Sequence, residues 1–134
     1  FDAKGVDWKD IPEGEPLFRA SADGRGFAVS GGVAQAVVHA VKRIDPEREV
    51  KVVNAEGLQN CKKMLQMAKA GKYNGYLLEG MACPGGCVAG AGTLQAVKKA
   101  AAALEKMKGE ASFTESSDSK YQSRLESLEK FDVE

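Results

Sequence analysis

The chain has 134 residues, and its 19 lysines and arginines balance 19 aspartates and glutamates. This length is enough for one domain with its own core, and the lack of a basic excess argues against a nucleic-acid binder. The sequence has neither the long apolar run of a membrane span nor the pattern of a secretory signal. Three cysteines are a poor fit to a disulfide framework, so we expect a reducing, cytoplasmic setting.

The chain begins with Phe1 rather than Met, so we expect the natural protein to begin upstream. Residues 1–22 are polar and are interrupted by proline and glycine, which predicts an irregular lead-in. Residues 25–30 favour a short buried strand. The two glycines that follow open a predicted helix over residues 31–44, whose apolar residues recur at helical spacing. An Asp-Pro pair directly after it ends this helix.

Two further strand–helix units follow. Residues 49–54 are rich in β-branched side chains and predict a strand, and residues 58–70 predict a helix. Residues 75–80 predict a third strand, and residues 93–108 a last helix, for which Thr93 is a candidate N-cap. Strand–helix units in series predict an α/β fold, with a mainly parallel β-sheet flanked by helices.

The predicted α/β lobe covers residues 23–110, and residues 111–134 are expected to form a linker and a C-terminal amphipathic helix. Two glycine-rich loops, at residues 30–32 and 81–92, each follow a predicted strand and precede a predicted helix. Ligands bind at the carboxyl ends of the strands in such sheets, so we expect both loops to lie at one edge.

Cys83 and Cys87 lie in the second of these loops, among several glycines. Thiolates bind soft metals and iron–sulfur clusters, and glycines let the backbone approach a bulky ligand. Three other interpretations are a zinc half-site, a redox dithiol and two unligated thiols. Zinc would need more ligands, for which His39 and Cys61 are the candidates. A redox pair is more typically Cys-x-x-Cys.

The loop resembles the third signature of the iron-only ([FeFe]) hydrogenases, Glu-x-Met-Ala-Cys-x-Gly-Gly-Cys-x-x-Gly-Gly-Gly. The residues that fit it are Glu79, Met81, Ala82, Cys83, Gly85, Gly86, Cys87, Gly90 and Gly92. Ala91 departs from the usual glycine, and Thr93 stands where Gln is common. The stretch from Phe27 to Val33 (Phe-Ala-Val-Ser-Gly-Gly-Val) resembles a second family stretch, Phe-Gly-x-Thr-Gly-Gly-Val. The chain thus resembles the C-terminal lobe of the catalytic domain of the hydrogenase large subunit.

The resemblance implies one lobe of a two-lobed domain that holds the H-cluster, a [4Fe–4S] cubane joined to a two-iron unit with CO and CN⁻ ligands. Four cysteines hold this cofactor in the family, and the loop would supply two of them. By position, Cys87 would bridge the two parts and Cys83 would ligate the cubane alone. Met81 would lie against the two-iron unit and, with Cys87, form the catalytic pair. The implied cofactor-binding residues are Cys83, Cys87, Gly85, Gly86, Met81 and Phe27.

The family's other two ligands come from the upstream signatures Thr-Ser-Cys-Cys-Pro and Met-Pro-Cys-x-x-Lys, and neither string occurs in this sequence. The implied activity of the intact parent is the reversible reduction of protons to H₂. Its implied partners are an upstream lobe and a ferredoxin-like electron carrier, without nucleic acid or membrane. We expect the isolated chain to be inactive and to lack the cofactor. The alternatives are a hydrogenase-like iron–sulfur assembly or sensing protein without hydrogenase activity, and a small electron-transfer or zinc-binding module.

Overall fold

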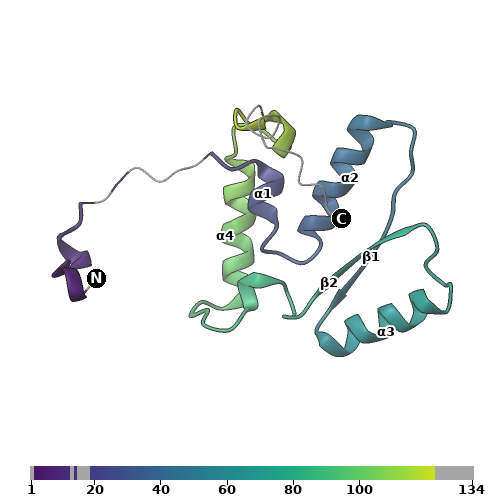
Figure 1. Ribbon diagram of the computed structural model, residues 1–134, viewed down its shortest axis with the longest axis horizontal. Coiled ribbons are helices and arrows are strands. Elements are labelled where there is room, and N and C mark those ends of the chain that lie inside the picture. Colours follow the sequence, from purple (N-terminus) through teal and green to yellow (C-terminus); the bar gives the residue numbers. More distant parts are fainter. Residues whose placement is uncertain (1, 13, 15–18, 123–134) are drawn as a thin grey trace, which may run out of the picture.

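The computed structural model describes residues 2–12, 14 and 19–122 (Figure 1). Its helices are α1 (Ala22–Gly26), α2 (Gly32–Ile44), α3 (Leu58–Lys69) and α4 (Val97–Gly109), and its strands are β1 (Lys51–Glu56) and β2 (Tyr76–Met81). Four short 3-10 turns complete the described elements: η1 (Asp2–Lys4), η2 (Trp8–Asp10), η3 (Cys87–Ala89) and η4 (Ser116–Asp118).

The two strands pair in parallel, with Lys51 opposite Tyr76 and Glu56 opposite Met81. Figure 1 shows α3 below the two strands and α2 above them, with α1 between α2 and α4. The α/β class, with a parallel sheet flanked by helices, is therefore confirmed. The described residues form two strands where the sequence predicts three.

The unit β1–α3–β2 follows the prediction closely because its signals are local. Gly57, with φ of +76°, turns the chain from β1 into α3, and Gly71, with φ of +82°, follows the end of α3. Positive φ costs glycine little because it has no Cβ. Met64 of α3 and Ala55 of β1 are buried, which places a small core between this helix and the sheet.

The predicted strand at residues 25–30 is wrong. Residues 22–26 form α1, whose start is capped by Ser21 Oγ, which accepts the Gly24 N–H at 2.9 Å. The next residues turn towards α2, and their backbone groups bind the cysteine loop instead of a strand. Val88 N–H donates to the Ala28 carbonyl at 3.1 Å, so no sheet ladder forms there.

The last helix of the predicted lobe begins later than residue 93. Both the Oγ1 and the N–H of Thr93 donate to the Gly90 carbonyl, at 2.8 and 3.2 Å. Thr93 therefore closes the preceding loop and does not cap α4. Leu94, predicted to lie on the apolar stripe of this helix, is fully exposed in the irregular segment before it.

The segment after α4, predicted to be a linker, packs on the helices. The N–H groups of Ala22 and Asp23 donate to the carbonyls of Phe113 and Thr114, at 2.9 and 3.0 Å. A backbone bond of this kind fixes the position of the segment on α1 without any special side chain.

Arg43, near the end of α2, binds the same segment through Asp118 at 2.7 Å and Glu115 at 3.3 Å. The hydrogen bond to Asp118, and to a smaller extent that to Glu115, raises the pKa of Arg43 above its ordinary value.

The predicted C-terminal helix lies mostly in residues 123–134, outside the described residues. The boundaries 1–22, 23–110 and 111–134 stay predictions. None of the described helices combines the length and the apolar character needed to cross a membrane.

Candidate metal centre

Both cysteines of the loop follow β2: Cys83 lies in the bend after the strand, and Cys87 begins η3. Cys83 is half-buried and Cys87 is exposed, and neither is in a disulfide. The Gly86 N–H donates to the Cys83 carbonyl at 2.9 Å, which folds the chain back between the two cysteines. Cys83 Sγ lies 3.9 Å from where a Cβ on Gly90 would be. Because the loop follows the last residue of β2, it lies at the carboxyl end of a parallel strand, as predicted.

The two glycine-rich loops lie in direct contact. Ser30 N–H donates to the Gly85 carbonyl at 3.3 Å. Gly86, with φ of +94°, approaches so closely that a Cβ there would lie 2.6 Å from Ser30 N and 2.7 Å from the Ala28 carbonyl oxygen. The prediction that these loops share one edge is thus correct in position, although no strand precedes the first loop.

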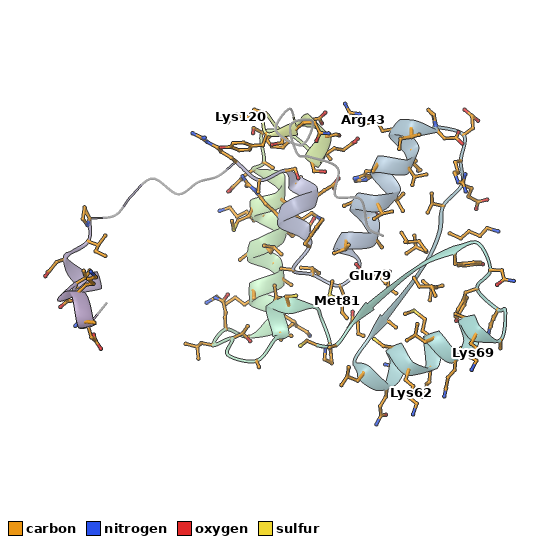
Figure 2. All side chains as sticks on the ribbon, in the orientation of Figure 1. Arg43, Lys62, Lys69, Glu79, Met81 and Lys120 are labelled. Atoms are coloured by element: carbon orange, nitrogen blue, oxygen red, sulfur yellow. The ribbon has the colours of Figure 1, made fainter. Side chains whose placement is uncertain are left out.

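Glu79, in β2, links the strand to the start of α2 (Figure 2). Its carboxylate accepts N–H groups from Gly31, from Val33 at 3.0 Å and from Ala34 at 3.0 Å. Gly31 has no side chain with which to cap α2, and a helix start leaves N–H groups unpaired. Glu79 fills this role from another element, and its charge is favourable at a helix N-terminus. This explains why a carboxylate only 8% exposed is tolerated.

Replacing Glu79 by alanine is expected to lower the free energy of unfolding by about 2–4 kcal/mol, because it removes a cap and leaves buried N–H groups unpaired. Glu79→Gln should cost less, since the amide oxygen can still accept one of the N–H groups. Urea unfolding followed by circular dichroism measures both. The control is Glu49→Ala, at an exposed position, for which we expect a change within about 0.5 kcal/mol. Equal midpoints for Glu79→Ala and Glu49→Ala would contradict the capping role.

Met81 is the last residue of β2, close to Glu79 on the same strand (Figure 2). It lies on a mainly apolar groove of about 250 Å³ between α2 and β2. The other lining residues are Val33, Ala34, Val37, Leu77, Leu78, Glu79 and Gly80. Phe27 lies in the turn after α1, and its side chain is 47% exposed. The turn that carries Phe27 is the one that contacts the cysteine loop.

The two side chains suggested for a zinc site make their hydrogen bonds elsewhere. His39 Nδ1 lies 2.9 Å from the Asp23 carboxylate, and its Nε2 lies 2.7 Å from Gln35. The Cys61 thiol donates to the carbonyls of Ala55 and Met81, each at 3.5 Å. Within the described ranges no three His, Cys, Asp or Glu side chains are grouped to hold a metal ion. The described part of the chain thus offers a pair of thiols and not a complete metal site.

Glu56 is the residue that the sequence prediction missed. Its Oε2 accepts the Gly85 N–H at 2.8 Å, between the two cysteines. The predicted strand ended at residue 54, two residues before β1 does, which placed Glu56 away from the site. The signal that could have found it is an acidic residue followed by glycine at the end of a parallel strand, next to the strand that leads into the cysteines.

Comparison with known proteins agrees with these features. Residues 1–91 match the family described as "Iron only hydrogenase large subunit, C-terminal domain". The chain is 32% identical over 117 residues to the "Periplasmic [Fe] hydrogenase large subunit" of Nitratidesulfovibrio vulgaris (strain Hildenborough). That alignment covers 66% of this chain and 28% of the relative. The chain therefore spans just over a quarter of the curated relative that it matches.

Proposed function

Because this chain belongs to the iron-only hydrogenase large-subunit family, as part of its C-terminal domain, we propose that it forms one lobe of a hydrogenase catalytic domain. In this proposal Cys83 and Cys87 are two of the four thiolate ligands of the H-cluster, and the intact parent interconverts protons and H₂. The observation that carries the proposal is the cysteine loop itself, held after β2 against the turn at residues 28–30.

The residues present fit half of such a cofactor site. Iron–sulfur clusters are held by cysteine thiolates, commonly four, and both loop cysteines are free thiols. Gly85 and Gly86, both with positive φ, let the loop backbone turn tightly and add no side chain of their own between the ligands. No group of three ligand side chains occurs in the described residues, so the other ligands have to come from elsewhere in the parent.

The small core of the described residues supports a lobe rather than a complete domain. The buried hydrophobic residues of the described part are only Ala34, Ala55 and Met64. Large apolar side chains are exposed on α2, on α3 and in the segment before α4, among them Ile44, Leu58, Leu65 and Leu94. Further protein surface is needed to cover them, and the proposed upstream lobe is its source.

The cofactor, when bound, supplies the redox chemistry of proton reduction, and the chain supplies its surroundings. The thiolates of Cys83 and Cys87 bind iron. Met81, which lines the apolar groove, and Phe27, in the turn before α2, would border the cofactor and restrict water around it. A ferredoxin-like protein is the proposed electron carrier of the parent.

The test is the iron and sulfide content after anaerobic reconstitution, measured on the chain alone and on the chain joined to its upstream region. We expect a cubane only in the joined form, because one lobe lacks two ligands. Hydrogen evolution from a chemical reductant is expected only from the joined form with a mature cofactor.

Two results would redirect the proposal. A stable cluster or stoichiometric zinc in the lone chain would favour a small metal-binding module. A joined protein that binds iron and sulfide but shows no infrared bands from CO and CN⁻ after maturation would favour the assembly or sensing protein.

A further inference from the structure

The peptide groups at the centre of the cysteine loop are held from two sides. The N–H of Gly85 donates to Glu56 Oε2 at 2.8 Å, and the carbonyl of Gly85 accepts the Ser30 N–H at 3.3 Å. These are two consecutive peptide groups, because the N–H belongs to the bond before Gly85 and the carbonyl to the bond after it. The midpoint between Cys83 and Cys87 is therefore fixed by β1 on one side and by the turn before α2 on the other.

The end of β1 contacts the loop at further points. The Gly57 N–H donates to the Met81 carbonyl at 2.8 Å, which extends the strand pairing to the residue after Glu56. A Cβ on Gly57 would lie 3.9 Å from Pro84 Cγ, in van der Waals contact. The Glu56–Gly57 corner thus runs alongside the loop from Met81 to Gly85. This explains how an exposed carboxylate can be aimed at a single amide.

The hydrogen bond from Glu56 differs in kind from the others that hold the loop. In the described part of the chain, the other hydrogen bonds of residues 83–87 join backbone groups to one another. They are therefore retained in most substitutions. Glu56 provides the side-chain hydrogen bond to this stretch. Its removal therefore deletes one hydrogen bond that positions the loop and leaves the backbone bonds in place.

We propose that Glu56 is a positioning residue that fixes the cysteine loop through the Gly85 amide and so keeps Cys83 and Cys87 at a defined relative placement. Its relevance to a cluster rests on the proposed function. The role requires only that the side chain at residue 56 accept the hydrogen bond from the Gly85 N–H. Any side chain of the same length with an acceptor oxygen should serve, and the negative charge is not needed.

The experiment measures alkylation of the three thiols by iodoacetamide in the metal-free chain, resolved by mass spectrometry. In Glu56→Ala, half-buried Cys83 should react about threefold to tenfold faster, as expected when one hydrogen bond no longer opposes local opening. Glu56→Gln should stay within about twofold of the parent chain, because its amide oxygen can accept the same N–H. Cys61, a residue of α3 whose thiol faces the sheet, reports on the rest of the fold and should not change in either variant.

Each other outcome overturns the proposal. An unchanged Cys83 in Glu56→Ala would show that the backbone bonds suffice. Equal acceleration in Glu56→Gln would mean that the effect is one of charge, and faster reaction of Cys61 as well would show general loosening. Glu49→Ala, a glutamate on the approach to β1 that is also exposed, controls for loss of surface charge.

The same variants in the joined protein connect the inference to the cofactor. Glu56→Ala should retain less iron there than Glu56→Gln does. Failure of the unmodified joined protein to bind iron would refute the proposed function, while the alkylation pattern would still decide the role of Glu56. The two failures are therefore distinguishable.

Discussion

Cys83→Ser and Cys87→Ser are each expected to remove most of the iron from the chain joined to its upstream region. Substituting a residue that hydrogen-bonds to a metal ligand commonly lowers the metal affinity about tenfold to a hundredfold. Loss of a ligand itself should therefore lower the iron affinity at least about tenfold. The hydroxyl of serine is a harder donor than a thiolate and remains protonated at neutral pH. The measurement is iron and sulfide per chain after anaerobic reconstitution, with the electronic absorption of the cluster as a second readout.

The matched control is Cys61→Ser, which replaces a thiol by a hydroxyl in the same way at a residue outside the loop. The Cys61 thiol donates to two backbone carbonyls and belongs to the contact between α3 and the sheet. A hydroxyl can make such a bond, so iron content should stay near that of the unmodified protein. If Cys61→Ser lost as much iron as Cys83→Ser, the assignment of ligands to the loop would be wrong.

The parts of the fold that the sequence predicted correctly are those with local signals. The helical spacing in residues 31–44 and the β-branched run before Gly57 depend on neighbours in the chain. The strand expected at 25–30 failed because a strand needs a partner, and the partner is set by distant residues. Here the backbone at Ala28 and Ser30 pairs with the cysteine loop, so a short apolar run became a turn.

The candidate site divides in the same way. The placement of Cys83 and Cys87 after a strand followed from the order of elements, because ligand loops gather where parallel strands end. The two carboxylates that hold the loops did not follow. Glu79 binds an N–H 46 residues away, and Glu56 binds one 29 residues away. The periodicity of a single sequence reports on residues that are close along the chain and not on contacts between distant ones. Only the three-dimensional arrangement therefore identifies the acceptor of each N–H.

The interlock of the two loops predicts that Gly86→Ala is among the most damaging single changes to this chain. At φ of +94° any Cβ is strained, at a cost of about 1–3 kcal/mol. The added methyl group would also lie 2.6 to 2.9 Å from backbone atoms of residues 28–30. Those atoms cannot move without breaking the bonds from Val88 and to Gly85, so overpacking adds about 1–3 kcal/mol. We expect a loss of about 3–5 kcal/mol in the free energy of unfolding.

Gly92→Ala separates the two causes, because Gly92 has a similar φ of +87° and no atom within 4 Å of its Cβ position. It should show the backbone strain alone, about 1–3 kcal/mol, without the added cost of overpacking. Urea midpoints of both variants, measured with an added osmolyte that favours the folded chain, give the difference between them. Gly86→Ala should also expose Cys83 to alkylation, since the loop can no longer seat against residues 28–30. Equal losses for the two variants would mean that the loops do not touch in solution. The cysteine pair would then lack the support from which its role as a cluster ligand is argued.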